Sequence, residues 1–242
     1  MAIIIFDVKS ILFERGSPLK VTKAKAAENR AALVQAAGRL FRERGIDGVG
    51  VAEISKKAGL THGALYAQFP SKEALAAEGF TSALKEGWEQ MTAGRDGRPA
   101  TLTDYLDWYL SFDHRDNLAT GCPMSASASE VARQDKILSE RFTEGFEQLV
   151  AVMERGLGAS PVKAENRQRA LAMAAAMIGG VAASRAVAKA DPKLSNQILR
   201  AVRRIVGEVG GEEGQVEGAR GRARATRRRA RGARSPAPST QL

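Results

Sequence analysis

Apolar residues in the first third of the chain recur at the spacing of one helix face. From Lys23 onward they occupy such a face at Leu33, Ala37, Leu40 and Phe41. Side chains at these intervals lie on one side of an α-helix. Gly45 follows, at a place where glycine commonly ends a helix. A first helix is therefore predicted between Lys23 and Gly45.

Two shorter helices are predicted directly after it, over about 51–58 and up to about Phe69. Their inward apolar residues are Val51, Ile54, Ala58, Leu65 and Phe69. Gly59-Leu60-Thr61 joins them, since glycine permits a sharp turn and Thr61 can cap the following helix. Two short helices joined in this way form a helix-turn-helix over 50–69. Its second helix can enter the major groove of duplex DNA, which is roughly 12 Å wide.

Beyond Pro70 the pattern predicts six further helices. They cover about 72–93, 101–112, a stretch from Pro123, 135–157, 164–190 and 192–206, with a polar loop at His114–Gly121. Aromatic residues make up only 5% of the chain, and alanine, leucine and long charged residues are abundant. Such a composition favours packed helices over sheets. The predicted fold class is all-α.

These elements divide the chain into four parts. Residues 1–22 have no clear period and form an N-terminal extension, and 23–70 form the helix-turn-helix domain. Residues 71–206 form a helical effector-binding and dimerisation domain. Residues 207–242 consist mostly of Gly, Ala, Arg, Glu, Ser and Pro without an apolar period, which predicts a disordered tail.

The charge of the chain lies mostly in that tail. The net charge is +10, and eight arginines stand between Arg220 and Arg234. Removing those eight charges leaves only +2 on the rest of the chain. The tail can add salt-dependent, nonspecific affinity for DNA by counterion release, or it can act as a solubilising extension.

Several function classes lack their sequence signals. Cys122 is the one cysteine, and His62 and His114 are the two histidines, which leaves too few ligands for a usual zinc site. No nucleophile elbow, phosphate loop or dinucleotide fingerprint is present, so neither an enzyme nor a cofactor is expected. Ala2–Phe6 is too short for a signal peptide core and Leu171–Ala183 too short for a membrane span. A cytoplasmic protein is predicted.

The exposed side of the predicted recognition helix suits contact with DNA. It presents His62, Gly63, Tyr66, Ala67 and Gln68, small residues that allow close approach together with polar groups for phosphates or base edges. Lys72, just after it, can reach a phosphate. Each residue also has a simpler interpretation: Tyr66 as a partly buried tyrosine, His62 as an inert surface side chain, and Gln68 as a helix cap.

The segment from about Glu28 to Trp88 resembles the TetR family of bacterial regulators. The matching residues are Ala36-Ala37, Leu40-Phe41, Gly45, Ile54, Ala58-Gly59-Leu60-Thr61, Gly63, Leu65-Tyr66, Phe69 and Ser71-Lys72-Glu73-Ala74-Leu75. The resemblance implies recognition-helix contacts at Thr61, His62, Tyr66 and Gln68, with Lys72 on the DNA backbone. One departure is Gly50-Val51, because the family usually has Thr or Ser here. Gly50 is a weaker cap, and the phosphate contact of a Thr or Ser at this position is expected to be absent. Val51 and Gly63 are still counted among the candidate DNA-binding residues.

The same resemblance implies that the helices beyond 71 pair with a second copy and bind a small effector. We predict that 135–157 and 164–190 form a four-helix seam with a partner, where Gly179-Gly180 and Ala183 allow close approach. A helix hairpin in the core of one subunit would show the same pattern.

The predicted effector site is an aromatic group, Tyr105, Trp108, Tyr109 and Phe112. An aromatic core without a cavity is the alternative. Cys122 precedes Pro123 at a helix start, where the helix dipole favours a thiolate, so a redox or electrophile sensor is a further hypothesis. A small buried residue is the other interpretation of this cysteine.

The resemblance implies a dimeric repressor that leaves a palindromic operator when a small molecule binds, whereas the residues alone leave both a repressor and an activator open. Two recognition helices about one DNA turn apart would read such a site. The rival function is a nonspecific nucleic-acid-binding protein driven by the basic tail.

Overall fold

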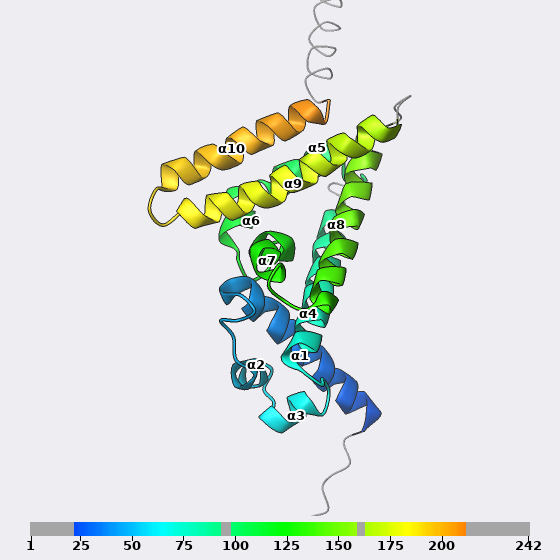
Figure 1. The fold of residues 1–242 in the computed structure, drawn as a ribbon, viewed down its shortest axis with the longest axis vertical. Helices are drawn as coiled ribbons and strands as arrows, with labels where there is room; N and C mark the ends of the chain where they lie inside the picture. The colour runs from blue at the N-terminus through cyan, green and yellow to red at the C-terminus, as the bar shows by residue number, and fades with distance from the viewer. Residues whose placement is uncertain (1–21, 93–97, 159–162, 212–242) are drawn as a thin grey trace, which may run out of the picture.

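The computed structural model describes residues 22–92, 98–158 and 163–211 (Figure 1). These ranges contain ten α-helices and no β-strand, which confirms the all-α prediction. The helices are α1 (Lys23–Arg44), α2 (Val51–Lys57), α3 (His62–Tyr66), α4 (Lys72–Thr92), α5 (Leu102–Tyr109), α6 (Phe112–Asp116), α7 (Pro123–Val131), α8 (Lys136–Gly156), α9 (Lys163–Val187) and α10 (Pro192–Val209).

The first three helices form a small unit at the lower end of the molecule in Figure 1, around the start of α4. α1 begins after Thr22, whose side chain accepts a hydrogen bond from the Lys25 amide at 3.2 Å. It ends at Gly45, where φ is 78°, a conformation that favours glycine. Leu33, Ile54 and the other predicted inward residues of this unit, Leu65 and Phe69 among them, are buried or half-buried. The predicted three-helix domain is therefore present.

α4 joins this unit to the rest of the molecule. Ser71 caps it, and its first half crosses α1 at two facing glycines. A Cβ placed on Gly38 would lie only 2.9 Å from the carbonyl oxygen of Gly79. Because glycine has no side chain, the two backbones can approach this closely. The second half of α4 packs on α8.

The remaining helices form the second helical unit, with α9 between α8 and α10 (Figure 1). Capping side chains start three of these helices, Thr101 before α5, Asp135 before α8 and Asp191 before α10. Met173, Met177 and Val181 of α9 are completely or almost completely buried. α9 is thus the central helix of this core.

One helix in the described part of the chain is long and apolar enough to cross a membrane, over Glu165–Val187 of α9. This stretch is longer than the Leu171–Ala183 segment that we judged too short. In its most apolar window, 44% is buried against neighbouring helices. The core helix of a protein outside membranes has the same length and composition, so the finding by itself assigns no membrane.

Three predicted boundaries were wrong. The helix predicted to run through Phe112 ends at Tyr109, because Ser111 caps a separate short helix, α6, with its Oγ accepting from the His114 amide. His114 therefore lies in a helix and not in a loop. The last helix continues to Val209, past Gly207, where we predicted the tail to begin. The Arg-rich segment itself lies outside the described residues.

The close crossing of α1 and α4 leads to a stability prediction. We expect Gly38→Ala to lower the free energy of unfolding by about 1–3 kcal/mol, because overpacking a tight contact forces the backbones apart. Gly87→Ala, in α4 itself, is the matched control: a Cβ there meets nothing within 4 Å. That variant should be neutral or stabilised by up to about 1 kcal/mol. Urea unfolding followed by circular dichroism measures both, and equal effects would contradict the proposed crowding at Gly38.

Candidate DNA-binding and ligand-binding sites

The turn before α3 fixes the orientation of the candidate recognition helix. Gly59 has φ 70°, and the Leu60 amide donates to the carbonyl of Ser55 at 2.8 Å. Thr61 caps α3, with its Oγ1 accepting from the Ala64 amide at 3.3 Å. Leu65 is fully buried beneath the helix. α3 is therefore held by a turn, a cap and one core side chain.

The opposite side of α3 is exposed. Thr61, His62, Gly63 and Ala67 are exposed, and Tyr66 is 50% exposed. The rings of His62 and Tyr66 lie 5.1 Å apart. A Cβ on Gly63 would meet nothing within 4 Å, so a large partner could approach closely at this point.

The other predicted DNA contacts are less exposed. Gln68 is half-buried, and Lys72 is half-buried at the first position of α4. Val51 is half-buried and packs against the core, while its preceding residue Gly50 offers no side-chain cap. Lys56 and Lys57, two exposed cations at the end of α2, were not among the predicted residues.

Arg30 of α1 holds the end of the recognition segment, a contact that sequence reasoning missed. Its Nη1 donates to the carbonyl of Gln68 at 2.6 Å, and its guanidinium carbon lies 4.1 Å from the centre of the Phe69 ring. The same guanidinium pairs with Glu78 of α4. Arg30 therefore connects α1 to α4 and to the segment that follows α3. No local pattern indicates this contact, because its partners are far away in the sequence.

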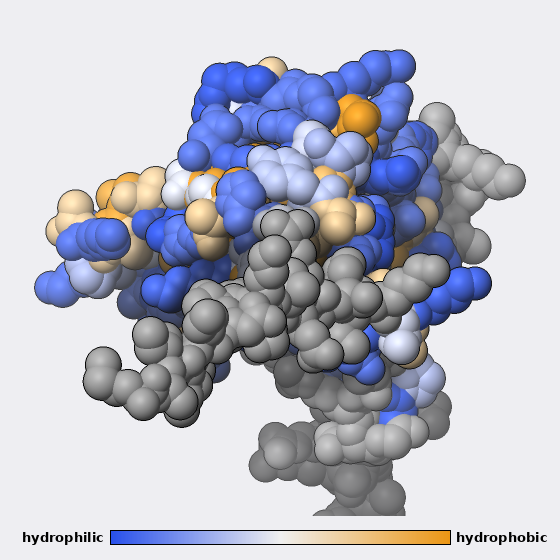
Figure 2. Space-filling model, turned by 90° about the horizontal axis from the view of Figure 1, so that it is seen from below, coloured by the Kyte–Doolittle hydropathy of each residue, from blue (hydrophilic) through white to orange (hydrophobic). Residues whose placement is uncertain are grey.

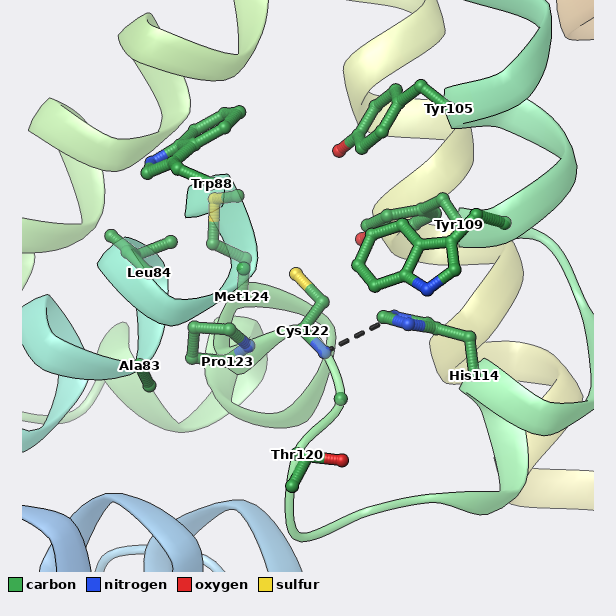
Figure 3. A pocket seen from close by; sticks show the side chains of 13 residues that line it. Ala83, Leu84, Trp88, Tyr105, Tyr109, His114, Thr120, Cys122, Pro123 and Met124 are labelled. Atoms are coloured by element: carbon green, nitrogen blue, oxygen red, sulfur yellow. Dashed lines mark hydrogen bonds between the residues drawn. The ribbon is translucent and has the colours of Figure 1, made fainter. Parts of the chain in front are cut away.

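A small cavity lies among α4, α5, α6 and α7 (Figure 3). It is lined by Ala83, Leu84, Gly87, Trp88, Tyr105, Trp108, Tyr109, His114, Thr120, Gly121, Cys122, Pro123 and Met124. Its volume is about 30 Å³, which is enough for about one water molecule. Trp108, His114, Thr120 and Gly121 also line a polar cleft of about 440 Å³, together with Asp107, Asp113 and other residues. The cavity and the cleft thus share a wall.

His114 is the centre of the aromatic group at this cavity. Its ring lies 4.6 Å from that of Trp108 and 4.9 Å from that of Tyr109. Its Nε2 accepts a hydrogen bond from the Cys122 amide at 3.2 Å, which requires that nitrogen to be unprotonated. Burial, assisted by the charge of Arg185, lowers the pKa of His114 to about 4. The imidazole is therefore neutral at pH 7.

The tyrosines and the cysteine complete the cavity wall. The hydroxyl groups of Tyr109 and Ser125 lie 2.8 Å apart in a hydrogen bond. Burial raises the pKa of Tyr105 and of Tyr109, so both stay neutral. Cys122 is 8% exposed, and its sulfur points into the cavity between Tyr109 and Met124 (Figure 3). This wall is uncharged and mainly apolar.

Phe112 is not part of this site, contrary to the prediction. It lies on α6 and is 36% exposed. The guanidinium carbons of Arg115 and Arg200 lie 5.2 Å and 5.5 Å from the centre of its ring. The helix break at Ser111 turns Phe112 away from Tyr105, Trp108 and Tyr109. His114 packs against the rings of Trp108 and Tyr109 in the position predicted for Phe112.

Residues 33–78 match the family model described as bacterial regulatory proteins of the tetR family. This segment of the chain is therefore similar to the DNA-binding part of TetR-family regulators. This confirms the predicted resemblance, and the matched segment runs from α1 through α2 and α3 into α4. It contains the turn, the cap and the exposed face of α3.

Similar proteins are named as regulators. The repressor BepR of Brucella suis is 44% identical over 54 residues, 22% of this chain and 26% of BepR. The regulator LmrA of Bacillus subtilis is 28% identical over 174 residues, 69% of this chain and 92% of LmrA. The alignment with BepR thus spans about a quarter of that protein, whereas LmrA matches along most of its length.

Solved structures share the whole fold. A TetR transcriptional regulator from Chloroflexus aurantiacus aligns with a TM-score of 0.60 at 23% identity, over 76% of this chain and 95% of the other. Reduced NemR of E. coli aligns with a TM-score of 0.58 at 19% identity, over 75% and 96% of the two chains. The arrangement of a helix-turn-helix unit and a second helical unit is therefore that of TetR-family proteins.

The buried neutral His114 makes stability depend on pH. The unfolded chain takes up a proton on this imidazole near pH 6.5 and the folded chain near pH 4, so the unfolded state binds more protons between these values. The stabilisation is complete above pH 6.5 and is lost progressively towards pH 4, by roughly 3 kcal/mol in total. Urea unfolding at pH 7 and pH 4.5 measures this loss.

His114→Gln is the matched variant, because the amide oxygen can accept from the Cys122 amide but does not titrate. The fall in stability between the two pH values should be smaller in the variant than in the wild type. An equal fall would show that the pH dependence comes from other groups.

Proposed function

We propose that this protein is a DNA-binding transcriptional regulator that acts as a repressor in the cytoplasm. The observation that carries the proposal is α3, a capped helix inside the segment matched by the TetR family, with one face buried and one face free. Where grey residues do not cover it, the face seen in Figure 2 carries many hydrophilic side chains together with some apolar ones. We propose no catalytic role, and the relatives are named as regulators.

In this proposal the exposed side chains of α3 read the major groove. Thr61, His62 and Tyr66 contact bases or phosphates, and Gly63 lets the helix approach the groove floor. The half-buried Gln68 and Lys72 contact DNA at the edge of this surface, and Lys72 binds a phosphate. We propose that Val51 packs α2 against the core, because its side chain points inward.

The Tyr66 side chain provides the test of DNA reading. We first select a duplex from random DNA with the wild-type protein and then measure its affinity in gel shifts with excess nonspecific DNA. Tyr66→Ala should weaken binding by about tenfold to hundredfold, the loss expected for a base contact of about 1–3 kcal/mol. Phe112→Ala, an exposed aromatic residue on α6, is the control and should bind normally.

A charge-driven nucleic-acid binder would behave differently in the same experiment. Nonspecific DNA would compete it away, no preferred sequence would emerge, and Tyr66→Ala would bind like the wild type. That result would replace the regulator proposal with nonspecific binding.

The proposed regulator is a homodimer paired through α9 and α10. Along α10, Leu194 is 42% exposed and Ile205 is 46% exposed, with Ile198 and Ala201 on the same face between them. α9 packs beside α10 and exposes small residues, Ala172, Ala175, Ala176, Gly179 and Ala183. An apolar ridge next to a flat surface of small residues suits close packing against a second copy.

This pairing differs from the seam predicted from the sequence, which used 135–157 and 164–190. Leu138, Leu149 and Met153 of α8 are buried, and this helix packs on α4 and α9 of its own chain. The apolar face of α8 is thus occupied, so α10 replaces it in the proposal.

Charged substitutions distinguish the two seams. Leu194→Glu and Ile205→Glu should weaken dimerisation by at least about tenfold, because a buried unpaired carboxylate is costly. Ile137→Glu is the control, since Ile137 is 49% exposed on α8. Sedimentation velocity over a concentration series gives the dissociation constants. A monomer produced by Ile137→Glu, with the α10 variants still dimeric, would favour the seam through α8.

We propose that a small molecule binding at the cavity and cleft releases the protein from a palindromic operator. Tyr105, Trp108, Tyr109 and Cys122 would contact it, and the cavity would have to widen from its small volume. Trp88 of α4 lines the same wall, so widening would displace α4. Because α4 also crosses α1, this displacement would change the separation of the two recognition helices, which a palindrome fixes at about 34–36 Å.

A further inference from the structure

Helix α7 connects the cavity to the helix-turn-helix by a route separate from α4. Its N-terminal end is held at the cavity wall: the Cys122 amide donates to His114, and Ser125 pairs with the Tyr109 hydroxyl. These contacts lie in the buried part of the molecule. A change in the aromatic wall therefore acts directly on the start of α7.

The other end of α7 is bonded to the turn between α1 and α2. Oε1 of Glu130 accepts a hydrogen bond from the Asp47 amide at 2.8 Å. A Cβ on Gly45 would lie 3.1 Å from each carboxylate oxygen of Glu130, so the absence of a side chain at Gly45 makes room for this group. Just beyond the helix, Nε2 of Gln134 donates to Oδ1 of Asp47 at 3.1 Å.

The rigidity of α7 and of the α1–α4 contact determines where a movement of α7 is transmitted. α7 has nine residues and is roughly 13 Å long, and such a helix moves nearly as one body. On the DNA side, α1 and the first half of α4 are locked together at Gly38 and Gly79. Movement of α7 relative to this unit therefore acts on α1, against which α7 packs, and on the hydrogen-bonded joint with residues 45–47.

We propose that α7 is a strut that transmits occupancy of the cavity to the helix-turn-helix, with Glu130 as the positioning residue at its joint. The inference rests on the proposed function, since it assumes that the cavity and the DNA-binding face communicate. Displacing Cys122 pushes α7 along its axis, and Glu130 carries this shift to the Asp47 backbone and so to the start of α2. Glu130 contacts neither DNA nor effector.

The single cysteine allows the cavity to be filled with a known group. Methyl methanethiosulfonate transfers a methylthio group to the Cys122 thiolate, which forms a mixed disulfide and releases methanesulfinate. Mass spectrometry counts the adduct. The affinity for the selected duplex is measured before and after labelling. In the wild type, labelling should weaken binding by about fivefold or more, the lower range of allosteric coupling. In Glu130→Ala the change should be less than about twofold.

Two variants distinguish the hydrogen bond of Glu130 from the mere loss of a negative charge or of a surface carboxylate. Glu130→Gln loses the same negative charge but keeps an oxygen that accepts from the Asp47 amide, so its response to labelling should match the wild type. Glu144→Ala removes an exposed carboxylate on α8 that pairs with Arg141, and its response should also be normal. Thermal unfolding by circular dichroism verifies that all variants are folded.

A second perturbation needs no reagent. Ser125→Val breaks the hydrogen bond to Tyr109 at the cavity end of α7. When Ser125→Val is made in the wild type, the affinity for the selected duplex should change. When it is made in Glu130→Ala, the change in the logarithm of that affinity should be less than half as large.

The outcomes are distinct. If unlabelled wild-type protein selects no sequence, the proposed function fails. If it binds its duplex but Glu130→Ala responds to both perturbations as strongly as the wild type, the coupling does not pass through this joint and the inference is wrong. The inference is also wrong if wild-type affinity changes with neither perturbation.

Discussion

The close contact of Gly38 with Gly79 determines how the two units of this protein are connected. Because no side chain separates the backbones, α4 packs against α1 as a part of the DNA-binding unit. The same helix then continues for several turns and supplies one wall of the cavity. One continuous helix thus belongs to both units. A larger residue at either glycine would separate the helices and loosen this connection.

The sequence predicted the elements that depend on local chemistry. The predicted starts near residues 101, 135 and 192 coincide with the capping side chains of Thr101, Asp135 and Asp191. The turn at Gly59 follows from a conformation that glycine adopts easily. The buried positions of the helix-turn-helix follow from helical spacing. The exposure of Thr61, His62 and Tyr66 was predicted as well, whereas Gln68 and Lys72 are half-buried. Val51 packs inward, as its place in the helical pattern indicates.

Features that depend on distant partners could not be predicted in this way. α6 has only five residues, too few to show a period, so His114 looked like part of a polar loop and Phe112 like part of α5. Periodicity shows that α8 has an apolar face but not which helix covers it. Arg30 and Glu130 are ordinary charged surface residues in the sequence, and their roles come from partners 38 and 83 positions away.

The cavity wall has an optical consequence. The chain contains two tryptophans, Trp88 and Trp108, and both line the cavity, from α4 and α5 respectively. Indole emission depends strongly on local polarity and on nearby groups that quench it. All of the tryptophan fluorescence of this protein therefore originates at one site, next to a thiol and an imidazole. The intrinsic fluorescence of the folded chain therefore reports the hydration, packing and solvent accessibility of this cavity.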